Sequence, residues 1–109
     1  MDFEININEK TLDFIKTLQE DVIAKIYSLL EVLSIKGNEL REPYSKALGS
    51  GLFELRIKGK DNIVRLFYAF QRGKQIYVLH GFIKKTQTTP KKELEIAYQR
   101  LKELNSKEK

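Results

Sequence analysis

Three apolar, strand-like runs follow one another at residues 52–58, 63–70 and 76–83, and only short polar segments separate them. The separating segments, residues 59–62 and 72–73, contain the Gly, Asn, Asp and charged residues that are typical of chain reversals. Connections this short force neighbouring strands to run antiparallel. The segment therefore predicts a three-stranded antiparallel meander, and the rest of the chain must pack around it.

The residues on either side of the meander show one further strand pattern and three helical patterns. Asn8 is the expected N-cap of the first helix, Gly37 is expected to end the second, and Pro90 is expected to precede the third. The predicted elements are a strand at 3–7, helices at 9–19, about 21–36 and after 90, and an ordered loop with a short helical turn at 38–51.

The predicted order β-α-α-β-β-β-α corresponds to a small α+β fold, with a mainly antiparallel sheet that carries a helical hairpin and its other helix on one face. The 109 residues are expected to form a single domain, 1–109. No apolar run approaches the ~20 residues of a membrane span. The first 30 residues carry charges throughout and contain no signal-peptide core, so we expect a cytoplasmic location. The lack of cysteine excludes disulfides and thiolate chemistry, and a single histidine argues against a zinc site.

The positive charge of the chain is concentrated in its second half. Residues 1–53 carry 6 basic and 9 acidic side chains, a net charge of −3, whereas residues 54–109 carry 14 basic and 6 acidic side chains, a net charge of +8. Between Leu55 and Lys92 there are ten Lys or Arg residues and one acid, Asp61. Basic side chains on a sheet face indicate an anionic partner such as a nucleic acid.

Strand alternation brings two arginines together on one face of the meander. Arg56 and Lys58 point away from the face that carries Leu55. If residues 59–62 form a four-residue turn, Arg56 lies directly opposite Arg65 on the next strand. Like charges in this position destabilise a sheet by some tenths of a kcal/mol. The pair therefore favours a functional role, namely binding of an anion.

The length of the second turn decides which lysine joins the arginines. A two-residue turn at 72–73 pairs Arg65 with His80 and places His80, Phe82 and Lys84 on the arginine face. An odd-length turn presents Gly81 and Lys85 instead, and a bulge near Gly81 also changes the choice. The sequence leaves both lysines open.

Each of these residues also has a purely structural interpretation. Arg56 could form a surface ion pair with Glu54 or with an acid on a neighbouring strand, and Lys84 and Lys85 could be solvated. Arg65, on a central strand, must find an anion. His80 fits a structural role as well as it fits a catalytic base. Tyr68 is expected in the core, and Tyr98 is expected to attach the last helix to the sheet.

Three motifs carry a resemblance to a known family: G-L-F-E-L-R at 51–56, V-R-L-F-Y at 64–68 and L-H-G-F-I-K-K-T-Q-T-T-P at 79–90. They resemble the RelE/ParE toxin superfamily, closest to its HigB-like, phage-derived branch. The resemblance implies a toxin that is encoded beside a helix-turn-helix, HigA-like antitoxin, which neutralises it. For HigB- and RelE-like members it also implies ribosome-dependent cleavage of mRNA in the decoding site, with no metal or other cofactor.

The resemblance places the basic site residues of the family on Arg56, Lys58 and Arg65, and on Lys84 or Lys85. The catalytic tyrosine of RelE-type members has no counterpart, because Lys91 stands near its place. The identity of the general base is therefore open.

The implied reaction is attack of an mRNA 2′-hydroxyl on its own 3′ phosphate, which leaves a 2′,3′-cyclic phosphate and a 5′-hydroxyl end. Arg56 and Arg65 would grip the phosphate, and Lys58 or Lys84/Lys85 would act as acid or base. His80 is a further candidate for proton transfer. Further basic residues would contact RNA phosphates: Lys60, Arg72, Lys74, Lys91 and Lys92.

Two other functions compete with the ribonuclease. A ParE-like inhibitor of DNA gyrase would bind protein and cleave nothing. A non-catalytic RNA-binding module would need aromatic platforms for base stacking, for which Phe67 and Phe82 are the candidates. The motif at 80–90 favours the ribonuclease.

Overall fold

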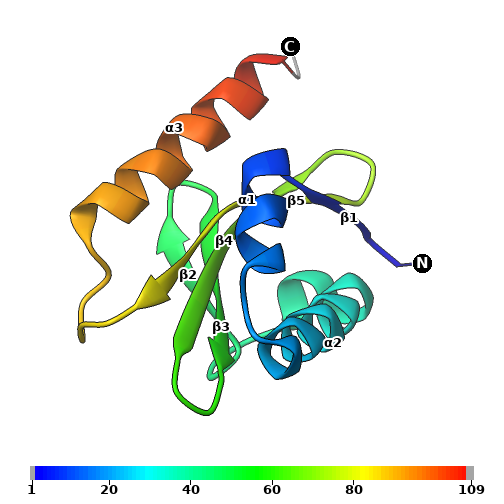
Figure 1. The fold of residues 1–109 in the computed structure, drawn as a ribbon. Helices are drawn as coiled ribbons and strands as arrows, with labels where there is room; N and C mark the ends of the chain where they lie inside the picture. The colour runs from blue at the N-terminus through cyan, green and yellow to red at the C-terminus, as the bar shows by residue number, and fades with distance from the viewer. Residues whose placement is uncertain (1, 108–109) are drawn as a thin grey trace.

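The computed structural model describes residues 2–107 and contains a five-stranded sheet with helices on both faces (Figure 1). The sheet order is β1-β5-β4-β3-β2, and only the β1–β5 pair is parallel. The α+β class and the mainly antiparallel sheet are thus confirmed. In chain order the elements are β1 (Glu4–Ile7), α1 (Glu9–Lys16), α2 (Glu20–Lys36), the 3-10 turn η1 (Gly37–Glu39), β2 (Ser45–Gly49), β3 (Leu52–Lys58), β4 (Ile63–Gln71), β5 (Gln75–Lys84) and α3 (Lys91–Lys107).

The first helix is shorter than its sequence pattern predicts. Asn8 caps it as expected, because its side-chain oxygen accepts hydrogen bonds from the backbone N–H groups of Lys10 and Thr11. The helix ends at Lys16 because both the hydroxyl and the backbone N–H of Thr17 bond back to the carbonyl of Phe14. None of the helices in the described part of the chain has the length and apolar character of a membrane span.

Strand β2 lies where the sequence predicted a loop. The segment S-K-A-L-G has no β-branched or aromatic residue, so its composition does not predict a strand. Its strand character comes from antiparallel pairing with β3, in which Ser45 lies opposite Leu55. The prediction of a loop over 38–51 was therefore wrong for Ser45–Gly49.

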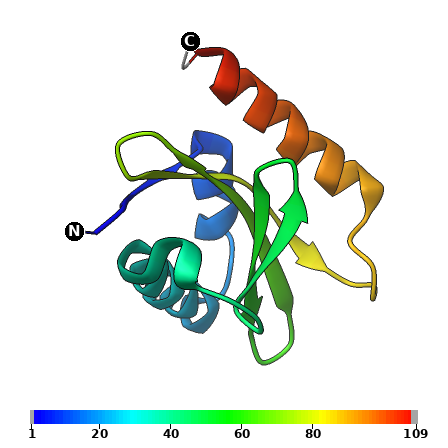
Figure 2. The ribbon, with the colours of Figure 1, turned by 180° about the vertical axis from the view of Figure 1, so that it is seen from behind.

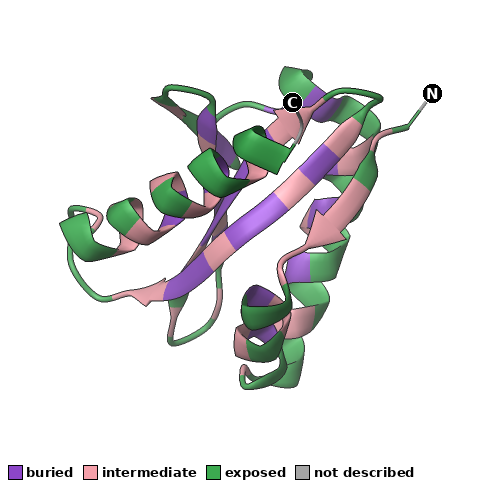
Figure 3. Ribbon diagram, turned by 90° about the horizontal axis from the view of Figure 1, so that it is seen from above, coloured by how far each residue is buried: buried purple, intermediate pink, exposed green. Residues whose placement is uncertain are grey.

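The closing helix α3 packs on the face of the sheet opposite to α1 and α2 (Figures 1 and 2). The expectation that the helices share one face was wrong for α3, since an amphipathic stripe predicts burial but does not name the face. Buried residues lie along the strands and the inner sides of the helices (Figure 3). The α1/α2 face buries Leu55, Ile57, Val64, Leu66, Tyr68, Ile76 and Val78. The α3 face buries Leu52, Phe67, Ala69, Leu79 and Phe82.

The β4–β5 hairpin differs from both registers that the sequence left open. Its turn contains the three residues 72–74, and a bulge interrupts the pairing between Phe67 and Tyr68. The odd-length turn and the single-residue bulge each shift the pairing of β5 by one residue, so together they leave its side chains on the faces that a two-residue turn would give. Arg65 consequently lies opposite Phe82, not His80, yet His80 and Lys84 remain on the arginine face, as a two-residue turn would have placed them.

Tyr68 is a core residue, as predicted. Its ring is buried, and its hydroxyl forms a short hydrogen bond with the hydroxyl of Ser45, which links β4 to β2. Burial raises the pKa of the Tyr68 phenol above its ordinary value of 10.0, and the hydrogen bond to Ser45 partly opposes this shift. The neutral phenol is therefore part of the folded structure.

Because the Tyr68 phenol is buried, the free energy of unfolding should fall at alkaline pH, and Tyr68→Phe should remove this part of the pH dependence. Because the pKa is raised in the folded state, the contribution of Tyr68 is complete below about pH 10 and is lost as the pH rises through the folded-state value. At pH 8 the variant should be less stable by about 1 kcal/mol, since Ser45 loses its partner. Between pH 8 and pH 11, however, its free energy of unfolding should fall less than that of the wild type.

Urea denaturation at the two pH values measures both effects. Tyr27→Phe is the matched control, because Tyr27 is exposed. Identical pH dependence in the wild type and Tyr68→Phe would contradict the prediction.

Candidate functional site

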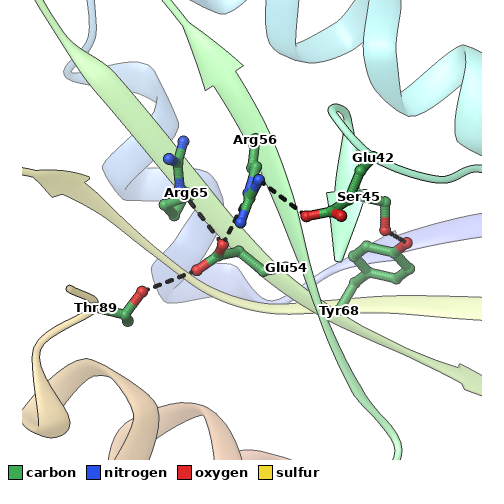
Figure 4. Close-up of polar contacts among 7 residues, drawn as sticks. All are labelled: Glu42, Ser45, Glu54, Arg56, Arg65, Tyr68 and Thr89. Carbon is green, nitrogen blue, oxygen red and sulfur yellow. Dashed lines mark hydrogen bonds and ion pairs between the residues drawn. The ribbon is translucent and has the colours of Figure 1, made fainter. Parts of the chain in front are cut away.

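Arg56 on β3 and Arg65 on β4 stand directly opposite each other, as the four-residue turn predicted. A buried carboxylate lies between them (Figure 4). Oε1 of Glu54 is 3.2 Å from Nε of Arg56 and 3.5 Å from Nε of Arg65. Glu54 is only 2% exposed, so water screens these interactions weakly. The negative charge offsets the repulsion between the two guanidinium groups.

Glu54 also connects the sheet to the segment that leads into α3. The hydroxyl of Thr89 donates a hydrogen bond to Oε2 of Glu54 at 3.1 Å (Figure 4). One carboxylate therefore joins β3, β4 and the β5–α3 connection. The sequence pattern suggested Glu54 only as an optional partner of Arg56, and its central position was missed. The signal was present, because Glu54 alternates onto the face of Arg56 and lies one strand away from Arg65.

Arg65 retains capacity to bind an anion. Its side chain is 12% exposed, and no described residue accepts a hydrogen bond from its Nε, whose contact with Glu54 lacks hydrogen-bond geometry. Burial lowers the pKa of the guanidinium, Glu54 opposes this shift, and the charge of Arg56 adds to it. An arginine still remains protonated in proteins. The group is therefore a partly desolvated cation, and such a cation is stabilised by a bound anion.

Arg56 has a second, exposed partner. Its Nη1 lies 3.4 Å from Oε1 of Glu42, whose side chain is 64% exposed. Glu42 lies in the turn before β2 and was not among the partners that the sequence suggested for Arg56. An exposed pair of this kind contributes less than about 1 kcal/mol. An incoming phosphate could therefore displace Glu42 at little cost, whereas Glu54 stays in place beneath.

The strand register separates the two candidate lysines. Lys84 is the last residue of β5 and lies opposite Ile63, two residues beyond Phe82 on the face of Arg65. Lys85 follows the end of the strand and is exposed. Lys58 is the last residue of β3, is exposed and lies on the same face as Arg56.

His80 is held between the sheet and α3. Arg100 donates from Nη1 to Nδ1 of His80 at 3.3 Å, so the other ring nitrogen, Nε2, carries the hydrogen and donates to Glu93 at 2.7 Å. The imidazole also stacks with Phe67 and Phe82. Both ring nitrogens are engaged, which favours the structural role over the catalytic one.

The aromatic platforms of the RNA-binding alternative are not accessible. Phe67 is fully buried and Phe82 is nearly so, beneath α3. Tyr98 attaches that helix as predicted, because its hydroxyl donates to the carbonyl groups of Leu48 and Gly49.

The remaining basic candidates lie outside the cluster. Lys60 belongs to the β3–β4 turn, and Lys91 and Lys92 begin α3, two residues beyond Thr89. Arg72 and Lys74 lie in the β4–β5 turn, at the far end of β4 from Arg65, and the ammonium of Lys74 stands over the ring of Phe3. Among residues 2–107, no group of three or more His, Cys, Asp or Glu side chains could hold a metal ion.

The chain matches one family of known sequences, and it shares its fold with solved structures. The family described as phage-derived protein Gp49-like (DUF891) matches residues 13–102. No curated protein matches the chain. The family match and the fold together confirm the resemblance to the RelE/ParE superfamily.

Two solved structures share the fold. A mutant of the Escherichia coli toxin RelE in the free state, with two arginines replaced by alanine, is 17% identical and has a TM-score of 0.66 over 93% of this chain and 99% of RelE. The archaeal RelE–RelB complex from Pyrococcus horikoshii OT3 contains a chain that is 16% identical, with a TM-score of 0.58 over 76% of this chain and 96% of that one.

The central position of Glu54 can be tested against its exposed counterpart. Glu54→Gln keeps the shape of the side chain but removes the charge that faces both arginines. We expect a loss of about 3 kcal/mol in the free energy of unfolding, because a buried charge cluster loses its anion. Glu42→Gln also removes a partner of Arg56, but an exposed one, and should cost less than about 1 kcal/mol. Equal losses in urea denaturation of the two variants would contradict the assignment.

Proposed function

The chain belongs to the family of phage-derived Gp49-like proteins, and from this membership, its RelE-like fold and its arginine pair we propose that it is the toxin of a type II toxin–antitoxin system, of the HigB-like branch, and cleaves mRNA on the ribosome. The observation that carries the proposal is the pair Arg56 and Arg65, which lie opposite each other on neighbouring strands. A buried carboxylate, Glu54, offsets the repulsion between the two guanidinium groups. Such a pair is costly for the sheet and well suited to a phosphate.

The arginine pair suits the charge that develops during RNA cleavage. Attack of a 2′-hydroxyl on the adjacent phosphate forms a phosphorane with additional negative charge on its oxygens. Guanidinium groups that are already oriented by Glu54 stabilise this charge without reorganising. Because Nε of Arg56 faces Glu54, its terminal amino groups are left for other partners, and Nη1 contacts the exposed Glu42, which a phosphate would replace.

Proton transfer requires groups other than the arginines, which remain protonated. Lys84, on the face of Arg65, is the better placed of the two lysines at the end of β5, and Lys58 stands at the end of β3. We assign one proton transfer to Lys84 and retain Lys58 as the partner for the other.

The partners follow from the same proposal. The similar archaeal structure is a complex of RelE with RelB, and we propose that a helix-turn-helix, HigA-like antitoxin neutralises this chain in a comparable way. The substrate would be mRNA on the ribosome, with Lys60, Arg72, Lys74, Lys91 and Lys92 as contacts to RNA phosphates. A cytoplasmic location follows from the ribosome as the site of action. The proposal treats residues 1–109 as one domain and requires no metal.

One observation favours a different activity. No tyrosine corresponds to the catalytic tyrosine of RelE-type members, and Lys91, near its place, is an exposed residue of α3. A ParE-like inhibitor of DNA gyrase would need no such base. It would stop replication and leave mRNA intact, so the same experiment separates the two activities.

Arg65→Ala should abolish cleavage of mRNA. Removal of one group that stabilises the transition-state charge lowers the rate by about 10²- to 10³-fold. Mapping of mRNA 5′ ends in translating cells that express the wild type or the variant measures this effect. Lys16→Ala is the control, because Lys16 is exposed at the end of α1, which packs on the opposite face of the sheet from the arginines.

The wild type should produce new 5′ ends, Lys16→Ala should retain them, and Arg65→Ala should lose them. Absence of new ends with the wild type overturns the ribonuclease proposal. Ends that persist with Arg65→Ala overturn the assignment of the site.

Lys84 and Lys85 form a second matched pair. Lys84→Met should lower the cleavage rate by about 10²-fold or more, because a group that transfers a proton is lost. Lys85→Met removes the same charge one residue later, beyond the strand, and should retain most of the activity. Single-turnover cleavage on purified ribosomes compares them, and a larger loss in Lys85→Met would reverse the assignment.

A further inference from the structure

A groove of about 750 Å³ opens beside the arginine pair, between α2 and the end of the β3–β4 hairpin. Arg56 and Arg65 belong to its wall, together with Lys25 and Lys58. The other lining residues are apolar or small, apart from the ring of Tyr44. None of the described lining residues is acidic. The groove therefore offers an apolar surface and four cations to whatever binds there.

Tyr44 forms part of this wall at a fixed place next to Arg56. Its carbonyl accepts a hydrogen bond from the backbone N–H of Arg56 at 2.9 Å, which continues the β2–β3 register by one residue beyond the pair Ser45–Leu55. Tyr44 thus stands opposite Arg56, which in turn stands opposite Arg65. The side chains of all three residues line the same groove. Tyr44 is nevertheless 54% exposed, so part of its surface is free.

The apolar part of the groove is also incompletely covered. Val32 on α2 and Ile63 at the start of β4 are both exposed, although both are large and hydrophobic. An exposed apolar patch with charged residues at its rim marks a binding site for another molecule. This patch is continuous with the arginine pair, because the same groove contains both.

Two lysines complete the charged rim. The ammonium group of Lys25 on α2 donates to the backbone carbonyl of Lys58 at 3.0 Å. This hydrogen bond fixes the cation at the end of β3, two residues from Arg56. The four cations of the groove outnumber the two carboxylates that contact its arginines, Glu54 and Glu42, and this excess of positive charge selects an anion. The aromatic ring beside them selects a flat apolar group attached to that anion. A nucleotide has both parts.

We propose that this groove binds a nucleotide of single-stranded RNA next to the phosphate held by Arg56 and Arg65, with its base stacked on Tyr44 and its own phosphate in contact with Lys25 and Lys58. The inference rests on the proposed function and adds a base-binding subsite to it. Stacking of this kind is tolerant of sequence, because every base has an aromatic face. The subsite would therefore position the strand and leave the choice of codon to other contacts.

The direct test is binding of a fluorescent pentaribonucleotide, in which methoxy groups replace the 2′-hydroxyls so that it cannot be cleaved, to the purified chain at low salt. Tyr44→Ala should weaken the affinity by about 10-fold or more, whereas Tyr44→Phe and Tyr44→Trp should retain it, because they keep an aromatic face. Tyr27→Ala is the matched control. Tyr27 lies on α2 and is 46% exposed, but it is not part of the groove.

Lys25→Gln tests the charged rim in the same assay. It should weaken binding and reduce the dependence of the affinity on salt, since one phosphate contact is lost. Lys36→Gln, at the opposite end of α2, is its control and should leave both quantities unchanged.

The outcomes separate the subsite from the function. Weak binding by Tyr44→Ala together with normal binding by Tyr27→Ala supports the subsite. Equal affinities of the wild type and Tyr44→Ala, with weak binding by Arg65→Ala, overturn the subsite and leave the phosphate site intact, as expected if the groove receives a protein segment instead. Failure of the wild type to bind the oligonucleotide also overturns the subsite. The proposed function then stands or falls separately on the 5′ ends found in translating cells.

Discussion

A single buried carboxylate allows this sheet to carry two arginines side by side. Without Glu54, Arg56 and Arg65 would repel each other across neighbouring strands, and the partly buried Arg65 would lack a counter-charge. Glu54 contacts both arginines, so the three side chains together carry two positive charges and one negative charge. The cluster is thus stable enough to fold, and once an incoming anion displaces the exposed Glu42 from Arg56 it has a net positive charge toward that anion. The hydroxyl of Thr89, in the segment before α3, donates a hydrogen bond to Glu54 and so links the site to the last helix.

The two faces of the sheet have different tasks. The α1/α2 face carries a continuous apolar core, in which the hydrogen bond between Tyr68 and Ser45 is a fully buried polar link. The α3 face is divided along β4 and β5. Toward the β4–β5 turn it is apolar and covered by α3, with His80, Glu93 and Arg100 as the polar link. Toward the other end it carries Arg65 and Lys84, where basic side chains replace the apolar cover.

The sequence predicted the parts of the site that depend on local geometry. The facing arginines followed from strand alternation and a four-residue turn, and both hold because neither depends on distant residues. The β4–β5 register could not be derived in this way, since a turn of odd length and a bulge between Phe67 and Tyr68 act together. Strand β2 and the face that α3 covers depend on tertiary packing, which short-range patterns do not contain. Glu54 was missed for a related reason, because a charged residue on an arginine face was expected to be a surface partner and not a buried one.

The lack of a tyrosine base changes what the rest of the site must supply. Arginines stabilise charge but do not transfer protons at physiological pH, and both ring nitrogens of His80 are occupied by Arg100 and Glu93. Glu54 cannot reach a substrate hydroxyl, because it is buried beneath the two guanidinium groups that it orients. Under the proposed function, the lysines at the ends of β3 and β5, Lys58 and Lys84, would therefore carry the proton transfer.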